Sequence, residues 1–296
     1  MASQQPSQFP PPSRATWRPL FQSHISKLVS PEFSLSTVHR DSSGVIHPRV
    51  RTCIFRGFWT ELRLGEAAKH QLLEDGNTSN ERGINPNTYE SDLLTFTTDV
   101  RMEKIAQIFS SSDGSRSGVE SGGGGRVEAV FWIKDVMTQW RIKGRAFIVG
   151  GDDDDPDELK AREDIWPWVR RREDSVDEDT KRWSWDKEIT AHFANLSPTM
   201  RGSFKNPPPG TPMSELPANP LLKLGQMVDD LHDPIARANF RVIVIVPEEV
   251  EKVDLNSPEE AKRVQWTLTQ LKAEIDANVP SPGYKYGTWK AIDLWP

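Results

Sequence analysis

VEAVFWIKDVMTQWRIKGRAFIVG, residues 127–150, is the stretch that decides the fold. It predicts two β-strands with a short break near Lys134 and Asp135. In the second strand, apolar or small side chains alternate with polar ones, the pattern of a half-buried strand. The polar face carries Gln139, Arg141, Lys143 and Arg145. An amide and three cations on one face can hold an anionic ligand, or they can be a solvated face whose charges protect the strand.

Composition excludes several classes of protein. The chain has 296 residues, a formal net charge of −6 and one cysteine. The negative charge argues against a nucleic-acid binder, and the single cysteine excludes an internal disulfide and a multi-cysteine metal site. We find neither an apolar run long enough to span a membrane nor a signal peptide, and the acidic run at 152–155 lacks the spaced ligands of a calcium loop. We therefore expect a soluble cytoplasmic protein with no metal site and no nucleic-acid or membrane partner.

The order of elements predicts one domain with insertions. Residues 1–16 are rich in Pro, Gln and Ser and predict a disordered tail. Residues 17–296 are expected to form the domain, with flexible insertions near 60–90, 110–126 and 150–180. Strands are expected at 33–39, 48–59, 93–99, 240–246, 250–255 and 289–296, with a turn at 247–249 that pairs 250–255 with 240–246. Helices are expected at 17–28, 100–109, 257–277 and within 159–205, where Trp185 and His192 lie on or beside one apolar face. Residues 60–90 are expected to form a long loop with little regular structure, and 207–220 a proline-rich loop. Helical insertions in a strand-rich chain without a βαβ rhythm predict a barrel-like α+β fold that is mainly β.

A strand that runs into a helix at residues 93–109 suits a phosphate. It places Thr97, Thr98, Arg101 and Lys104 around the start of the helix. Backbone donors, hydroxyls and cations at a helix N-terminus favour a phosphate group. The alternative is an ordinary helix cap, because Thr or Asp before a helix caps it without any ligand.

Taken in order, several segments resemble one family. They are RTCIFR (51–56), FTTDVRMEK (96–104), TQWRIKG (138–144), FRV (240–242) and WKAIDLWP (289–296). The chain resembles the pyridoxamine 5′-phosphate oxidase-like, FMN-binding split β-barrel proteins. AHFANLSPTMRGSFKNPPPG (191–210) is similar to a branch of fungi, plants and cyanobacteria. The resemblance implies a Greek-key-like split barrel with peripheral helices, and a homodimer with FMN at its interface.

The resemblance also implies site residues. FMN-binding roles fall on Arg51, Arg56, Thr97, Thr98, Lys104 and Gln139, with Arg101 and Arg141 as further candidates. Met102 and Glu103 replace the family's serine and arginine before the lysine, and Arg101 is the cation that could substitute for them. No catalytic residue is identified.

The part of the family's sequence pattern that binds the substrate phosphate differs in this chain. Near the C-terminus the family's arginine-x-histidine pair has no counterpart, and Arg263 is the one credible cation for a substrate phosphate. The sequence therefore predicts an FMN-dependent oxidoreductase, with a B6 vitamer as a doubtful substrate. The alternatives are an FMN-binding module without turnover, or a scaffold that kept the fold after losing the flavin.

Overall fold

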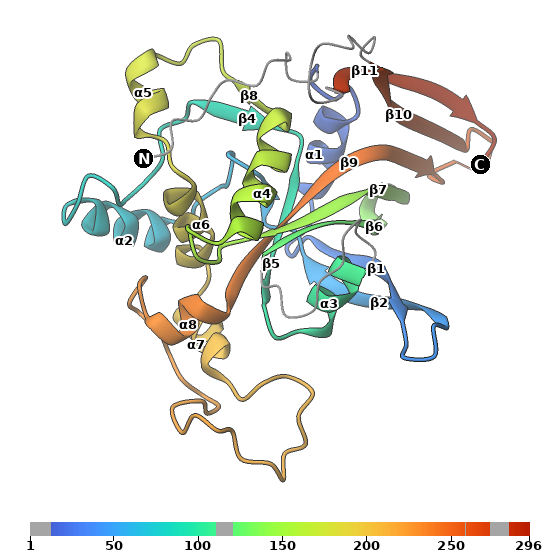
Figure 1. Ribbon diagram of the computed structural model, residues 1–296. Helices are drawn as coiled ribbons and strands as arrows, with labels where there is room; N and C mark the ends of the chain where they lie inside the picture. The colour runs from blue at the N-terminus through green and yellow to red at the C-terminus, as the bar shows by residue number, and fades with distance from the viewer. Residues whose placement is uncertain (1–12, 111–120, 258, 273–283) are drawn as a thin grey trace, which may run out of the picture.

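The computed structural model describes residues 13–110, 121–257, 259–272 and 284–296, and one long strand organises them. This strand, β9 (Phe240–Asp254), crosses the middle of the molecule (Figure 1). On one edge it pairs with β7 (Thr138–Val149) along nearly its whole length. On the other edge, β5 (Leu94–Asp99) takes the first half and β10 (Lys262–Lys272) the second. A single strand thus joins two parts of the sheet.

The remaining strands extend the sheet on both sides. β6 (Gly122–Ile133), β1 (Glu32–Arg40) and β2 (Ile46–Ile54) follow β7, and β11 (Tyr284–Leu294) follows β10. After β2 the short β3 (Gly57–Phe58) pairs with β5. The sheet bends toward closure here but is not closed. The described pairings are antiparallel, and the predicted fold class, mainly β with peripheral helices, is confirmed.

Helices and short strands surround this sheet. They are α1 (Arg18–Ile25), α2 (Glu66–Gly76), α3 (Glu103–Ser110), α4 (Pro156–Ile165), α5 (Asp177–Arg182), α6 (Trp185–Ala194), α7 (Pro198–Gly202) and α8 (Pro234–Asn239), with β4 (Tyr89–Ser91) paired to β8 (Val169–Arg171). Single 3-10 turns lie at 134–136, 166–168 and 203–205. α3 packs against β1 and β6, α4 against β6 and β7, and α6 against β9 (Figure 1).

The predicted alternation in β7 is confirmed. Trp140 and Ile142 are fully buried, while Arg141 and Lys143, which alternate with them, are half-buried. Trp140 packs with Phe21 of α1 and stacks on Trp266 of β10. One apolar core therefore fills the inside of the bent sheet, and a second lies between β9 and the helices.

The prediction of little regular structure at 60–90 is wrong. This segment contains α2 and β4, and α2 buries Ala68 and Leu72. The acidic stretch 151–158 is also more ordered than a loop, because Asp155 caps α4 by accepting from the backbone N–H of Asp157 at 3.0 Å. Glu158 is fully buried and accepts from the backbone N–H groups of Gly150 and Gly151.

Two predictions near the C-terminus are wrong. Residues 250–255 do not return through a turn, because β9 continues past Pro247 with only a shift of register opposite Gly144. A Cβ on Gly144 would lie 2.0 Å from the Val246 carbonyl oxygen, so glycine permits this close crossing. The helix expected at 257–277 is the strand β10 at 262–272, where Trp266 and Leu268 alternate toward the core.

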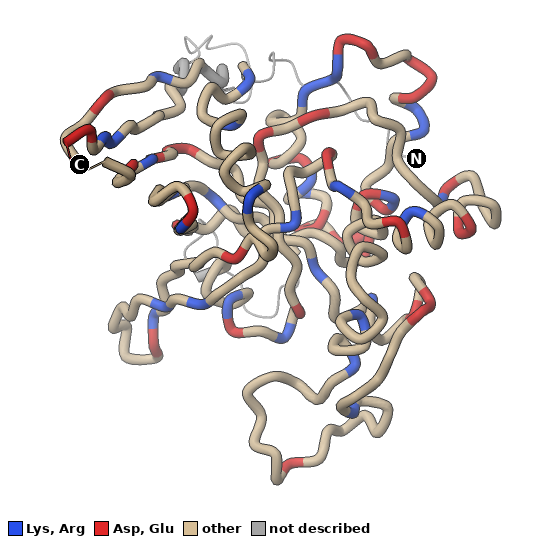
Figure 2. The backbone as a smooth tube through the Cα atoms, turned by 180° about the vertical axis from the view of Figure 1, so that it is seen from behind, with Lys and Arg blue, Asp and Glu red and all other residues tan. Residues whose placement is uncertain are grey.

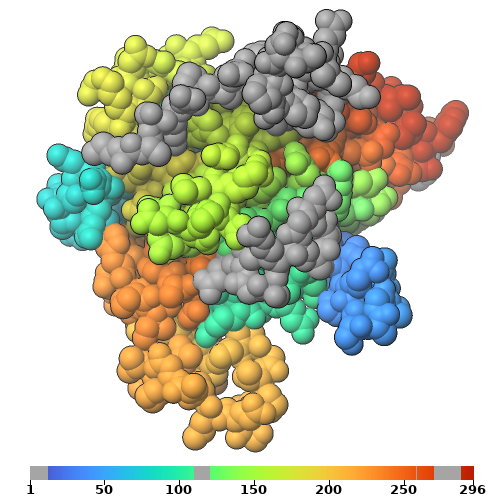
Figure 3. Space-filling model, viewed as in Figure 1, coloured from blue at the N-terminus to red at the C-terminus, as the bar shows by residue number. Residues whose placement is uncertain are grey.

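The ends of the segments also differ from expectation. Residues 1–12 and 111–120 lie outside the described residues. The packed chain begins at Arg14 rather than Trp17, since Ala15 is buried and its N–H donates to Asp92 at 3.1 Å. Residues 122–126, expected in an insertion, begin β6. The proline-rich loop expected at 207–220 is present and projects from the rest of the molecule (Figure 3).

Candidate functional site

Three side chains from β2, β5 and α3 form what we call the Arg51–Lys104 group: Arg51, Thr98 and Lys104. The Arg51 guanidinium donates to the Leu35 carbonyl oxygen at 3.1 Å, to Thr37 Oγ1 at 2.7 Å and to the side-chain oxygen of Gln107. Lys104 Nζ donates to Thr98 Oγ1 at 2.9 Å. Among the described residues neither cation has an ion pair with a carboxylate.

The electrostatics of this group favour an added anion. Burial lowers the pKa of Lys104, and the positive charge of Arg51 lowers it further, against the opposing effects of Cys53 and Asp99. Burial also lowers the pKa of Arg51. Two partly desolvated cations that disfavour each other's charge are stabilised when a negative group arrives. The six-residue spacing from Thr98 to Lys104, set by the β5–α3 junction, creates this geometry.

Two other predicted FMN residues, Arg101 and Thr97, do not join this group in the single chain. Arg101 donates to Asp99 Oδ1 at 2.9 Å and to the Asn206 carbonyl oxygen at 3.0 Å, so its guanidinium is used to hold the loop after α7. Thr97 is half-buried and adjoins the buried Thr98 on β5, so its side chain points to the opposite face of the strand. The structure thus joins Thr98 to Lys104 but directs Arg101 elsewhere.

The polar face of β7 is a lattice of ion pairs. Arg141 lies 2.6 Å from Glu128 and 3.6 Å from Glu251, and Arg263 lies 2.6 Å from the same Glu251. Lys143 pairs with Glu249 at 2.6 Å and Arg145 with Glu248 at 2.9 Å. The structure therefore brings the predicted residues Arg141 and Arg263 together through a shared carboxylate. Both signs of charge are spread over the chain in Figure 2.

Gln139 lies at the end of this face. It is half-buried, opposite Trp132 on β6 and Val253 on β9. Within one chain no described hydrogen bond or ion pair connects Gln139 or Arg141 to Arg51 or Lys104. The two halves of the predicted FMN site are therefore separate in the single chain.

Arg56 lies apart from both groups, on the wall of a cavity of about 520 Å³. Its Nε has no hydrogen-bond partner among the described residues. α6 contributes Glu188 to the same wall, a residue that the sequence reasoning missed. The available signal was its position, because Glu188 lies three residues after Trp185 and four before His192, both of which were predicted on the apolar face of this helix.

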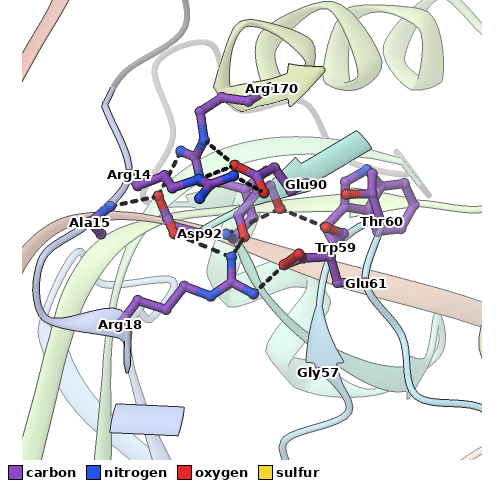
Figure 4. A network of polar contacts seen from close by, with 12 residues as sticks. Arg14, Ala15, Arg18, Gly57, Trp59, Thr60, Glu61, Glu90, Asp92 and Arg170 are labelled. Atoms are coloured by element: carbon purple, nitrogen blue, oxygen red, sulfur yellow. Dashed lines mark hydrogen bonds and ion pairs between the residues drawn. The ribbon is translucent and has the colours of Figure 1, made fainter. Parts of the chain in front are cut away.

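A network of arginines and carboxylates closes one side of the cavity (Figure 4). We call this the carboxylate network; its members are Arg14, Arg18, Glu61, Glu90, Asp92 and Arg170. Arg18 of α1 contacts both Glu61 and Asp92, and Arg170 of β8 bridges Glu90 and Asp92. Because Arg18 and Glu61 also line the cavity, the network fixes that wall.

The described part of the chain contains no helix long and apolar enough to cross a membrane. It also contains no cluster of three or more His, Cys, Asp or Glu side chains arranged to hold a metal ion.

Comparisons with known proteins identify the fold and the cofactor. Residues 14–150 match the family model described as pyridoxamine 5′-phosphate oxidase, FMN-binding domain. An uncharacterised protein of Saccharomyces cerevisiae is 21% identical over 316 residues, covering 88% of this chain and 95% of its own length. The solved structure of a pyridoxamine 5′-phosphate oxidase-related, FMN-binding protein from Nostoc punctiforme matches with a TM-score of 0.51 and 19% identity. That match covers 96% of this chain and all of the other.

The match of residues 14–150 to this FMN-binding domain confirms the resemblance predicted from the ordered motifs. The predicted split-barrel fold and the predicted cofactor, FMN, are confirmed with it. The Arg51–Lys104 group lies within the matched range.

Proposed function

We propose that the chain is an FMN-dependent oxidoreductase in which Arg51, Thr98 and Lys104 hold the FMN phosphate. The observation that carries this proposal is the pair of partly buried cations without a carboxylate partner among the described residues, Arg51 and Lys104. A phosphate with close to two negative charges would replace the hydroxyl and amide oxygens that now satisfy them. When bound, FMN would supply the two-electron redox chemistry.

We propose further that the working unit is a homodimer with FMN at the interface. Gln139 is the residue that the family resemblance directs to the flavin ring, and Arg141 is a further candidate on the same strand face. Within one chain neither has a described hydrogen bond or ion pair to the Arg51–Lys104 group. A second copy would bring the two halves together, with Gln139 donating to the ring, whereas the charge of Arg141 is already compensated by Glu128 and Glu251. Thr97 remains a predicted FMN residue, whereas Arg56, which was predicted with it, lies on the wall of a separate cavity and is not part of this proposal.

A second candidate function is an FMN-binding module that does not turn over B6 vitamers. The observation that favours it is the position of Arg263, which is already paired with Glu251 at 2.6 Å. A substrate phosphate would have to compete with a carboxylate that is only 4% exposed.

Two measurements test these proposals. The protein as purified, or after incubation with FMN, should show the visible absorbance of bound flavin, and titration of apo-protein should saturate at one FMN per chain. Failure to bind FMN would support the scaffold alternative. Oxygen consumption with pyridoxamine 5′-phosphate should be weak or absent, and efficient turnover that Arg263→Ala abolishes would restore a B6 oxidase.

A further inference from the structure

The cavity beside Arg56 has a composition that differs from the proposed FMN site. It lies between α1, the β3 turn and α6. Its apolar wall includes Ile25, Phe55, Phe58 and Leu62. With a volume of about 520 Å³, it has room for a small organic molecule.

The cations around this cavity are not equivalent. Arg18 and Arg172 are both held by Glu61, so their charges are compensated. Arg63 is exposed. Arg56 is half-buried and makes no side-chain hydrogen bond or ion pair among the described residues, and burial lowers its pKa. A partly desolvated guanidinium without a partner is a ready site for one negative charge.

The carboxyl of Glu188 completes the polar part of the wall. Its Oε1 accepts from the backbone N–H of Thr60 at 3.0 Å, and its Oε2 accepts from Asn85 Nδ2 at 3.2 Å. Thr60 adopts a positive φ of 70°, a conformation that is costly for a β-branched residue and that directs its N–H toward Glu188. Burial raises the pKa of Glu188 to about 7, although these two hydrogen bonds lower it, and the charge of Glu61 adds to the rise.

We propose that this cavity binds an organic carboxylate with an apolar body, whose anionic group pairs with Arg56 and accepts a hydrogen bond from the protonated carboxyl of Glu188. A carboxylate fits better than a phosphate because a single uncompensated, partly buried arginine offers one positive charge. This inference goes beyond the proposed function and does not rest on it, since it uses no member of the Arg51–Lys104 group.

Among the charged groups around the cavity, Glu188 is the one whose carboxyl changes protonation state near neutral pH. Facing the cavity are Glu61 and the cations Arg18, Arg56, Arg63 and Arg172. On α6 itself, Lys187 turns its Nζ to the carbonyl oxygens of Asn80 and Arg182. His192 is stacked on Trp59 and stays neutral over this range, because burial and the nearby Arg56 lower its pKa to about 3.

The test uses benzoate, which stays ionised from pH 5.5 to 8.5, and calorimetric titration of the full-length protein with its FMN bound. Benzoate should bind at pH 6 and weaken about 30-fold by pH 8.5, because Glu188 loses its proton and then repels the ligand. Phenyl phosphate at pH 6 should bind more weakly than benzoate. Tighter binding of phenyl phosphate would overturn the assignment to carboxylates.

Two variants locate the effect. Glu188→Gln keeps the size and a hydrogen-bond donor but cannot ionise, so its benzoate affinity should be nearly constant from pH 6 to 8.5. Arg56→Ala should lose at least about tenfold in affinity at pH 6. Arg49→Ala removes an exposed cation of β2 and should bind as the wild type does.

Retention of the wild-type pH profile in Glu188→Gln, or of wild-type affinity in Arg56→Ala, would overturn the inference. Flavin absorbance recorded on the same samples separates this result from a failure of FMN binding. The wild-type pH profile is a test without any substitution, so it holds even if a variant does not fold.

Discussion

The carboxylate network and the Arg51–Lys104 group are both built from partly buried cations, and they differ in what those cations contact. Arg170 has a side chain only 9% exposed and lies 2.7 Å from Asp92 and 3.3 Å from Glu90. Arg51 and Lys104 donate instead to a carbonyl, hydroxyls and an amide. In the first region, each arginine is paired with a carboxylate of the same chain. The second gains stability when an anion binds.

The polar face of β7 belongs with the first region. Its cations Arg141, Lys143 and Arg145 each have a glutamate partner. Read as sequence, this face and RTCIFR are equally basic, so residue type cannot separate a structural cation from a ligand-binding one. The presence or absence of a carboxylate partner separates them, and four substitutions test that distinction.

The largest effect is expected from Arg170→Ala. It leaves Glu90 and Asp92, both 8% exposed at the side chain, without the arginine that bridges them. Loss of one partner from a buried ion pair costs about 3–4 kcal/mol of unfolding free energy, measured by urea denaturation. The matched control is Arg14→Ala, which also removes a partner of Glu90 but is 70% exposed and should cost under about 1 kcal/mol. Equal effects of the two variants would show that burial does not set the strength of this network.

Glu188→Gln tests the opposite case, a buried acid without a cationic partner among the described residues. The pKa of Glu188 is about 7 in the fold against 4.5 as a reference. A raised carboxyl pKa means that the neutral form is favoured, so its contribution is fully present below about pH 4.5 and is lost as pH rises through about 7. At pH 8 the variant should therefore be more stable than the wild type, by as much as about 3 kcal/mol.

The same variant should have nearly wild-type stability at pH 4.5, where Glu188 is protonated. Thermal unfolding at the two pH values gives the comparison, and Glu178→Gln, 74% exposed on α5, is the control that should show no such difference. If the difference in stability between the variant and the wild type were the same at both pH values, Glu188 would not have a raised pKa in the folded protein.

Local patterns predicted the local parts of this molecule. Alternation over 139–146 gave the buried and polar faces of β7 correctly, because a strand assigns its faces residue by residue. The β5–α3 junction brought Thr98 to Lys104 because the end of the strand, the turn at 100–102 and the start of the helix fix their separation. Both features depend on contacts between near neighbours in sequence.

Contacts between distant segments were not predictable. Glu251 meets Arg141 and Arg263 only because β9 runs on past Pro247 between β7 and β10. A proline followed by two glutamates is typical of a turn, so the sequence favoured a hairpin at that point. The strand continues through Pro247, which has no backbone N–H to donate, because Gly144 of β7 lacks a side chain and allows the two strands to cross closely there. The sequence therefore did not show that Glu251 pairs with the basic face of β7.

Lys104→Ala is expected to have an intermediate effect, and on FMN binding rather than on stability. The variant removes one of two cations proposed to hold the phosphate. Loss of a hydrogen bond to a charged group costs about 1.5–3 kcal/mol, which corresponds to a loss in FMN affinity of roughly 10- to 150-fold. Titration of apo-protein measures it. Unchanged affinity would place the phosphate elsewhere and remove the main difference between the two regions.

Lys143→Ala should have the smallest effect, and it is the control for Lys104→Ala because it removes the same side chain from a paired site. Lys143 and Glu249 are 44% and 26% exposed, so water and salt screen their attraction. The unfolding free energy should fall by about 0.2–1 kcal/mol, and less at high salt.

FMN affinity should change less than about threefold in Lys143→Ala, because the lost charge was already compensated by Glu249. A double-mutant cycle with Glu249→Ala, followed by urea denaturation, isolates the energy of the pair. A coupling above about 2 kcal/mol would mean that a half-exposed pair on β7 is as strong as the buried carboxylate network. A large loss of FMN affinity in Lys143→Ala would instead mean that a cation with a carboxylate partner still serves the ligand, and that partners do not separate the two kinds of site.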